Sequence, residues 1–241
     1  MFEQSVIAAA QAHAVAEYPR ESCGLVVDGK YTPYKNIHPK PEQAFKMATN
    51  AWLSAHKRGE IQAVIHSHPD GPDCPSADDM QGQVDTAIPW GIICTDGKDC
   101  LPTTWFGDAV PTPTLTGRGF RHGVTDCYSL IRDYYKTQRG ILLPEFPRNW
   151  EWWTEDDGDL YGQGFKQAGF VKITPEEVRP GDVFLAQIMS KVPNHGGVLL
   201  EGGLALHHLS AKLPVDMARL SRREPLNRWR NHVTHWLRYE G

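Results

Sequence analysis

The sequence predicts an α+β protein of two domains. In the first half, short apolar segments of strand length alternate with segments of helical periodicity, whereas the second half opens on one amphipathic helix and continues with several strand-like segments. Alternating Pro and Thr residues between the halves favour an extended linker. We therefore expect domains at residues 1–110 and 118–241, joined by a linker at residues 111–117. For the first half alone, the mixture of elements also allows an α/β layer fold.

The elements of the first half can be assigned in order. Small and apolar residues at helical spacing predict a helix over residues 2–17, which Pro19 ends. Residues 24–27 are a short apolar strand, and the Asp28-Gly29 pair that follows is typical of a hairpin turn. The further predicted elements are helices over residues 42–58 and 78–87 and strands over residues 61–65, 90–94 and 103–106.

The second half begins with a predicted helix over residues 127–135. Its apolar and aromatic positions have helical spacing, and Asp126 is suited to the N-cap position. A turn at residues 179–182 leads into a predicted strand over residues 183–186. Two more strands are predicted over residues 196–200 and 204–208.

The composition excludes several classes of protein. Apolar residues make up 40% of the chain and charged residues 22%, as in globular proteins. The net charge of −4 argues against a nucleic-acid partner. We expect no integral membrane segment, because no apolar run is long enough, and no signal peptide, because the N-terminus lacks its basic and apolar regions. The odd number of cysteines, without CxxC spacing, predicts free thiols in a reducing compartment; they are Cys23, Cys74, Cys94, Cys100 and Cys127.

Two histidines follow the predicted strand over residues 61–65. His66 and His68 stand two positions apart, so on a strand their side chains project to one face, close enough to share a metal ion. Asp79 follows eleven residues after His68 and adds a carboxylate. Two imidazoles and a carboxylate form a three-ligand set that leaves one zinc position open, as in hydrolytic zinc sites. In the alternative interpretation, Ser76 and Asp79 form a capping box and Asp79 simply caps a helix.

Four of these side chains resemble, in type and spacing, the motif of the JAMM (MPN-type) metalloproteases; they are His66, His68, Ser76 and Asp79. That family also has a Glu-x-Cys-Gly segment upstream, and Glu21 begins such a segment here. The resemblance implies a JAMM/MPN-like domain with a mixed sheet and helices, and a Zn²⁺-dependent (iso)peptidase activity. It implies that His66, His68 and Asp79 bind the zinc ion. It also implies that Glu21 is the general base and that Ser76 hydrogen-bonds the oxyanion.

The second half contains a candidate nucleophile. Cys127 lies in the first turn of the predicted helix, and a helix N-terminus favours negative charge and lowers the pKa of a thiol. The alternative is a small buried apolar side chain, which is the usual role of a free cysteine. A thiolate nucleophile needs a base and a group that orients the base. His195 and His207, on adjacent predicted strands, could supply these two roles.

This pattern resembles the NlpC/P60 cysteine peptidases, which have Asp-Cys at a helix start, a His that opens a Gly-containing strand, and a third polar residue on the next strand. The matching positions are Asp126-Cys127, His195 and His207, with His208 as the alternative to His207. The resemblance implies a papain-like α+β domain that acts on peptides of the bacterial cell wall. It implies that Cys127 attacks, His195 takes its proton and His207 orients His195.

The order of the two halves resembles, over essentially the full length, the tail tip assembly protein K family of lambda-type phages. The resemblance implies other phage tail tip proteins as partners and a peptide or peptidoglycan as substrate. It also implies a location in the host bacterial cytoplasm during assembly, and it allows for retention in the virion tail tip. The competing hypothesis is a structural tail-assembly factor in which the zinc site is a fold element and hydrolysis is not required.

Overall fold

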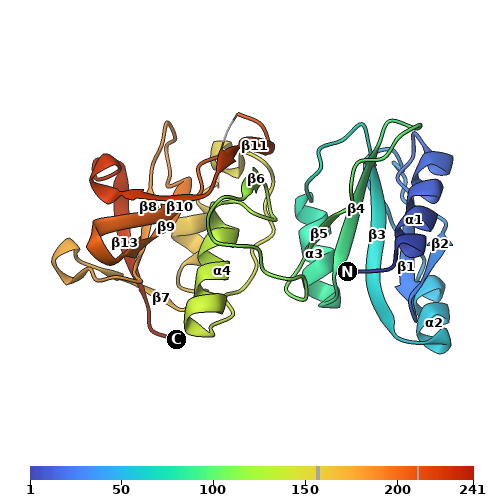
Figure 1. The fold of residues 1–241 in the computed structure, drawn as a ribbon, viewed down its shortest axis with the longest axis horizontal. Helices are drawn as coiled ribbons and strands as arrows, with labels where there is room; N and C mark the ends of the chain where they lie inside the picture. Colours follow the sequence, from blue (N-terminus) through green and yellow to red (C-terminus); the bar gives the residue numbers. More distant parts are fainter. Residues whose placement is uncertain (156–157, 211) are drawn as a thin grey trace. The chain divides into compact units, whose positions relative to one another are not determined.

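The computed structural model describes residues 1–155, 158–210 and 212–241. The chain forms two compact units, which consist of Met1–Pro75 with Gln81–Pro111 and of Ser76–Met80 with Thr112–Gly241. Each unit combines helices with a sheet of its own (Figure 1). The predicted α+β class and the two-domain layout are therefore confirmed.

The first unit is built on a mixed five-stranded sheet in the order β2-β1-β3-β4-β5 (Figure 1). The strands are β1 (Cys23–Val27), β2 (Lys30–Tyr34), β3 (Ile61–Pro69), β4 (Trp90–Thr95) and β5 (Thr104–Phe106). Neighbouring strands are antiparallel except β3 and β4, which run parallel. A parallel pair needs a crossover connection, and α3 (Ala77–Thr86) lies within it.

The two faces of this sheet are covered by different helices (Figure 1). On one face, α1 (Gln4–Glu17) packs its buried side chains against Ala63 and Ile65 of β3. Because strand side chains alternate, His66 and His68 project from the opposite face. On that face, Trp90 of β4 donates a hydrogen bond of 2.9 Å from Nε1 to Oγ1 of Thr86 in α3.

In the first unit, two predicted elements differ from the structure by more than two residues at one end. The helix expected over residues 42–58 is α2 (Thr49–Arg58), and the prediction was wrong for the residues before Thr49. The side chain of Asn36 accounts for the difference, because it bonds to the backbone there: Nδ2 donates to the Ala44 carbonyl over 3.0 Å, and Oδ1 accepts from the Lys46 N–H over 3.1 Å. Strand β3 continues through Pro69, so both histidines lie within it.

The second unit contains an antiparallel six-stranded sheet in the order β12-β10-β9-β8-β13-β7. Its strands are β7 (Phe170–Ile173), β8 (Val183–Ala186), β9 (His195–Leu200), β10 (Leu204–His207), β12 (Arg222–Pro225) and β13 (Val233–Tyr239). A separate two-stranded sheet consists of β6 (Gly119–Arg121) and β11 (Val215–Leu220). The helices are α4 (Cys127–Arg139) and α5 (Leu160–Gly164), with short 3₁₀ turns at Trp152–Thr154, Pro175–Glu177, Glu201–Gly203 and Leu226–Arg228.

Helix α4 begins and ends on recognisable signals. The Asp126 side chain accepts a hydrogen bond of 2.9 Å from the Ser129 N–H, so the predicted N-cap is confirmed. The helix ends at Gly140, whose left-handed conformation suits glycine. Ile131 and Tyr135 are buried in the core with residues of β8 and β9, which fixes the helix against the sheet. The start of α4 therefore lies close to the start of β9.

Among the helices of the described chain, none has the length and the apolar character that crossing a lipid bilayer requires.

Candidate active sites

Strand pairing brings Glu21 to the histidines of β3. Cys23 of β1 stands opposite His66. The Ser22 N–H donates to Ser67 Oγ over 2.8 Å and the Ser67 N–H donates to the Ser22 carbonyl over 3.0 Å, so the pairing continues beyond the end of β1. One further step in this antiparallel register places Glu21 opposite His68. An acidic residue more than 40 positions away in the sequence thus reaches the His-x-His pair.

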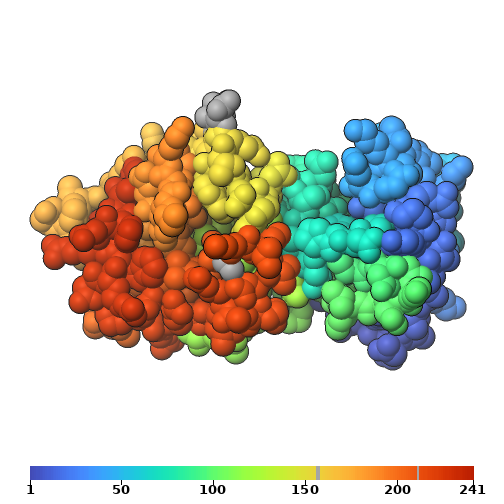
Figure 2. All heavy atoms as spheres, turned by 90° about the horizontal axis from the view of Figure 1, so that it is seen from above, coloured from blue at the N-terminus to red at the C-terminus, as the bar shows by residue number. Residues whose placement is uncertain are grey.

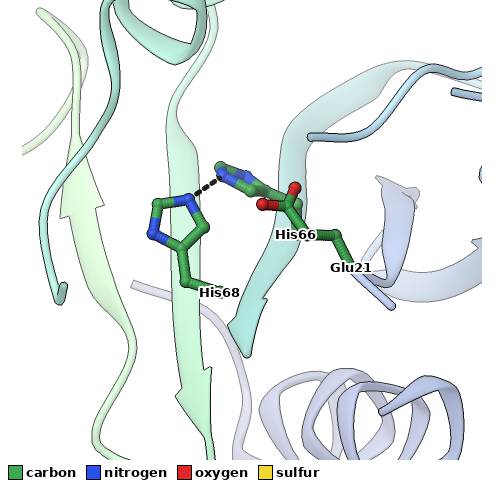
Figure 3. Close-up of side chains that lie close together, drawn as sticks. All are labelled: Glu21, His66 and His68. Carbon is green, nitrogen blue, oxygen red and sulfur yellow. Dashed lines mark hydrogen bonds between the residues drawn. The ribbon is translucent and has the colours of Figure 1, made fainter. Parts of the chain in front are cut away.

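The three side chains converge on one point (Figure 3). Nε2 of His66 lies 3.1 Å from Nε2 of His68, and the ligand atoms of Glu21, His66 and His68 all lie within 4.8 Å of one another. All three residues are buried. Nδ1 of His68 lies 3.0 Å from the Pro72 carbonyl, which can only accept, so Nδ1 carries the hydrogen and Nε2 directs a lone pair at the cluster.

The cluster fits a zinc ion. Zinc prefers imidazole nitrogen, thiolate and carboxylate ligands in a tetrahedron with Zn–N bonds near 2.0 Å, which sets ligand atoms about 3.3 Å apart. The Nε2 atoms of His66 and His68 are 3.1 Å apart, close to that separation. The rings of Phe45 and Trp90 contact the His66 ring, with centroids 4.7 and 5.8 Å away. These apolar walls lower the local dielectric and strengthen electrostatic interactions at the site.

Ser76 and Asp79 bond to each other at the start of α3. The Ser76 N–H and hydroxyl donate to Asp79 Oδ2 over 2.8 and 2.7 Å, and the Asp79 N–H donates to Ser76 Oγ over 3.1 Å. This is the capping arrangement that the sequence allowed. Asp79 is buried, yet it is not a member of the group of three converging side chains. The structure thus brings Glu21 to the two histidines, and it holds Oδ2 of Asp79 on Ser76.

In the second unit, Cys127 lies in a pocket that His195 also lines. Its Sγ is 3.1 Å from the Tyr161 hydroxyl. Burial, together with the negative charge of Asp126, raises the pKa of the Cys127 thiol to about 11, although the hydrogen bond with Tyr161 acts in the opposite direction. The expected lowering of this pKa by the helix start was wrong, because desolvation of the thiolate outweighs it.

A line of hydrogen bonds runs from His195 away from the pocket. His195 Nε2 lies 3.0 Å from His207 Nδ1, and His207 Nε2 lies 2.6 Å from Oε1 of Glu224. The neighbouring His208 points elsewhere, because its Nε2 donates to the Arg219 carbonyl over 3.0 Å. His207 and not His208 therefore contacts His195. Burial, with the nearby His207 and His208, holds the pKa of His195 well below its usual value, so the ring is neutral at pH 7 and can accept a proton.

Asp126, the residue before Cys127, forms an ion pair with Arg148. Asp126 Oδ2 accepts hydrogen bonds of 3.1 and 2.7 Å from Nε and Nη2 of Arg148, and Arg148 Nη1 also donates to Glu145 over 2.6 Å. Burial opposes ionisation of Asp126, but the Arg148 guanidinium, His122 and the Ser129 N–H outweigh it and hold the pKa of Asp126 well below its usual range. Asp126 thus fixes the start of α4 as a buried ion pair.

Much of the remaining wall of this pocket is aromatic; it includes Phe146, Trp150, Trp152, Trp153 and Tyr161. The segment that carries the three tryptophans, yellow in the space-filling view, lies at the surface of the second unit (Figure 2). Two residues that contact the candidate residues could not be identified from the sequence. They are Tyr161, which contacts Cys127, and Glu224, which contacts His207. Tyr161 has no local signal, and Glu224 stands among arginines in a segment that is typical of a solvated surface.

Comparison with known proteins gives a family match for each half. The family of prokaryotic homologs of the JAB domain matches residues 3–106, and the NlpC/P60 family matches residues 117–235. The chain is 34% identical over 217 residues to the tail tip assembly protein K of Escherichia phage N15. The aligned region covers 87% of this chain and 86% of that protein. It is 37% identical over 167 residues to the tail tip assembly protein K of Escherichia phage lambda, which covers 69% of this chain and 79% of that protein.

A shorter likeness involves the first half. Over 96 residues the chain is 34% identical to a probable TtuB-protein conjugate cleaving protease of Thermus thermophilus, which covers 36% of this chain and 64% of that protein.

Proposed function

The chain belongs to the tail tip assembly protein K family, and we propose that it acts in the assembly of a phage tail tip through two hydrolytic sites. The first is a zinc-dependent (iso)peptidase site, and the second is a cysteine peptidase or amidase site for cell-wall peptide. One observation carries the proposal: in each unit, buried side chains of complementary chemistry meet although they are distant in the sequence. Glu21 meets His66 and His68 in the first unit, and His195 meets His207 beside the pocket of Cys127 in the second.

In the first site, we assign His66, His68 and Asp79 as ligands and Glu21 as the general base. A zinc ion bound there would supply a Lewis acid and would lower the pKa of a water molecule from 15.7 to about 7. The Glu21 carboxylate would accept a proton from the attacking water and deliver it to the leaving amine. The Ser76 hydroxyl would turn from Asp79 to the oxyanion, an interaction that commonly contributes about 3 kcal/mol per donor.

The bond class follows from the same site. A water nucleophile with a carboxylate base and a cation suits hydrolysis of an amide or isopeptide bond. The likeness of the first half to a probable TtuB-protein conjugate cleaving protease supports this class. Support for the ligand assignment comes from the buried donor set and from the His68 tautomer, which presents Nε2 to the cluster.

Metal content tests the roles of Glu21 and Asp79. A general base is not needed to hold the ion, so Glu21→Gln should retain about one zinc per chain, whereas His66→Ala and Asp79→Asn should lose most of it after dialysis against a chelator. Inductively coupled plasma mass spectrometry gives the readout. Asp78→Asn, at the exposed neighbouring position of the same helix, is the control and should retain zinc. Loss of zinc from Glu21→Gln with retention in Asp79→Asn would make Glu21 the third ligand and contradict our assignment.

In the second site, Cys127 is the nucleophile, His195 is its base and His207 orients His195. The Cys127 thiol gives its proton to neutral His195 as the sulfur attacks the carbonyl carbon. The protonated His195 then gives this proton to the leaving nitrogen, so the amine departs and the acyl-enzyme is left with a neutral His195. Water then hydrolyses the thioester with His195 again as base. The pKa of the resting thiol is raised to about 11, so Cys127 is protonated before substrate binds. The thiol therefore gives up its proton only when it attacks the bound substrate.

A second candidate function is a structural assembly factor without required hydrolysis. The resting state of Cys127 favours it, because the thiol is protonated and bonded to the Tyr161 hydroxyl over 3.1 Å. Complementation separates the two candidates: a lambda-type phage that lacks its own copy is supplied with the wild-type chain, with Glu21→Gln, with Cys127→Ala or with both. We expect infectious particles to fall most in the double variant. Normal plaque numbers from the double variant would establish the structural role instead.

The remaining assignments follow from membership of the family. We propose that the partners are other tail tip proteins and that the chain acts in the host bacterial cytoplasm during assembly. We also propose the domain boundaries at residues 1–110 and 118–241, with the linker at residues 111–117. The irregular and mostly exposed conformation of residues 111–117 supports a linker there.

A further inference from the structure

The hydrogen-bonded line in the second unit ends on a carboxylate. Strand β12 pairs with β10 so that Arg222 stands opposite His207 and Glu224 opposite Ala205. His207 and Glu224 are therefore diagonal neighbours on adjacent strands, a separation that a long side chain can bridge. The contact is short, 2.6 Å from His207 Nε2 to Glu224 Oε1. Both side chains are buried.

This carboxylate dictates where two imidazoles carry their hydrogens. An ionised carboxylate only accepts, so His207 must carry its hydrogen on Nε2 and present a lone pair at Nδ1. His195 Nε2, which lies 3.0 Å from that lone pair, must then carry the hydrogen of His195. The remaining nitrogen, His195 Nδ1, is left with a lone pair. Of the four ring nitrogens of His195 and His207, it is the one that this line leaves able to accept a proton.

We propose that Glu224 is a positioning residue for the cysteine site, which it serves by fixing the tautomers of His207 and His195 so that His195 Nδ1 is basic. This inference rests on the proposed function of Cys127 and His195. Without an acceptor at position 224, His207 is free to carry its hydrogen on Nδ1. It would then donate to His195 Nε2, and His195 would hold its hydrogen on Nδ1, where it cannot take the proton of the thiol.

The surroundings hold Glu224 in this role. Trp229 Nε1 donates to Oε1 over 2.8 Å, and Arg228 Nη1 donates to Oε2 over 3.0 Å. Arg222 Nε lies 3.5 Å from Oε1. The Trp229 ring also contacts both imidazoles, with centroids 6.0 Å from His195 and 5.1 Å from His207. These donors keep the carboxylate ionised and oriented, and partial burial alone would work against that.

Two substitutions separate the acceptor from the charge. Glu224→Met keeps the length of the side chain and removes the acceptor, whereas Glu224→Gln keeps an acceptor oxygen without the charge. The readout is the rate at which iodoacetamide alkylates Cys127 at pH 7.5, measured by peptide mass spectrometry. We expect Glu224→Met to lower this rate about 10-fold or more. A positioned base commonly raises a rate by about 10²–10⁴, and the variant should lose part of that factor. Glu224→Gln should restore most of the rate. Glu201→Met, at an exposed position of the same unit, is the matched control.

Imidazole ¹⁵N chemical shifts test the tautomers directly and need no substrate. In the wild-type chain we expect hydrogens on Nε2 of both His195 and His207, with the same pattern in Glu224→Gln. In Glu224→Met we expect His207 to lose this preference. Thermal unfolding of each variant identifies any rate loss that comes from the fold. A hydrogen on His207 Nδ1 in the wild-type chain would overturn the inference, as would an unchanged alkylation rate in folded Glu224→Met.

One further variant separates this inference from the proposed function. If His195→Ala slows the alkylation of Cys127 but Glu224→Met does not, the base assignment stands and the role of Glu224 is wrong. If His195→Ala leaves the alkylation unchanged, His195 is not the base, and the proposed cysteine site fails together with the role of Glu224.

Discussion

At the scale of single residues, the two candidate sites differ in charge. The first is suited to a cation, whereas the second holds neutral side chains. Glu21 and the His66–His68 pair are a buried donor set, and burial of such a set is stable when a cation or a hydrogen bond satisfies each ligand atom. Cys127 is instead held neutral, because its pocket is apolar and the adjacent Asp126 is negative. His195 is neutral as well. Cys127 and His195 therefore rest as a neutral thiol and a neutral imidazole rather than as an ion pair.

The reactivity of Cys127 should follow this resting state. Its folded pKa of about 11 lies above the value of about 8.5 for a free cysteine, so at any pH below 11 the folded chain holds less thiolate than the unfolded chain. The rate of Cys127 alkylation should therefore keep rising from pH 8 towards pH 11. In denaturant the rise should level off near pH 9. An alkylation rate of the folded chain that stays level between pH 8 and pH 11 would contradict the raised pKa of Cys127.

At the scale of elements, the start of α4 depends on a buried ion pair. Asp126 caps the helix through the Ser129 N–H while Oδ2 binds Arg148, and both side chains are almost completely buried. One carboxylate thus connects the helix to the segment before the tryptophans. The same connection places Cys127 in the first turn of the helix, at the edge of the pocket.

Removal of Arg148 should destabilise the second unit strongly. Arg148→Met leaves the Asp126 carboxylate buried without its cation, and the loss of one partner of a buried pair commonly costs about 3–5 kcal/mol. Urea denaturation at pH 7, followed by tryptophan fluorescence, measures the free energy of unfolding. Arg230→Met, which removes an exposed guanidinium from the same unit, is the control and should change stability little. A loss below about 1 kcal/mol in Arg148→Met would show that the pair is not important for stability.

At the scale of the whole molecule, each of the two units has a core of its own. The core of α1 and the five-stranded sheet lies entirely in the first unit, and the core around Tyr135 and Leu185 lies entirely in the second. Residues 111–117 have no regular secondary structure, and most of them are exposed. Each unit has the size and the core of a domain that can fold by itself.

Limited proteolysis should divide the chain at this segment. Thermolysin cleaves before large apolar residues, and Leu115 is such a residue within residues 111–117. We expect early cleavage there and two fragments that resist further digestion, because their own backbones are engaged in sheets and helices. Zinc should follow the first fragment, and iodoacetamide reactivity of Cys127 should remain with the second. Digestion of either fragment as soon as the linker is cut would contradict independent domains.

Much of this protein is determined by local sequence. Spacing of two predicts that His66 and His68 share a face, because strand side chains alternate, and this holds in β3. Asp126 predicts a helix start, because its side chain can bond a backbone N–H three residues ahead. The prediction of a helix before Thr49 was wrong because Asn36 binds that backbone from outside the segment.

Contacts between distant segments were decided only by the tertiary structure. The register of β1 on β3 brings Glu21 to His68, and the register of β12 on β10 brings Glu224 to His207. Tyr161 reaches Cys127 through the packing of a segment without any local signal. The pKa of Cys127 was mispredicted for the same reason: a helix start is a local feature, whereas desolvation depends on everything that surrounds the thiol. The sequence alone thus determined which side chains are available for chemistry, and the pairing and packing of distant strands decided which of them meet.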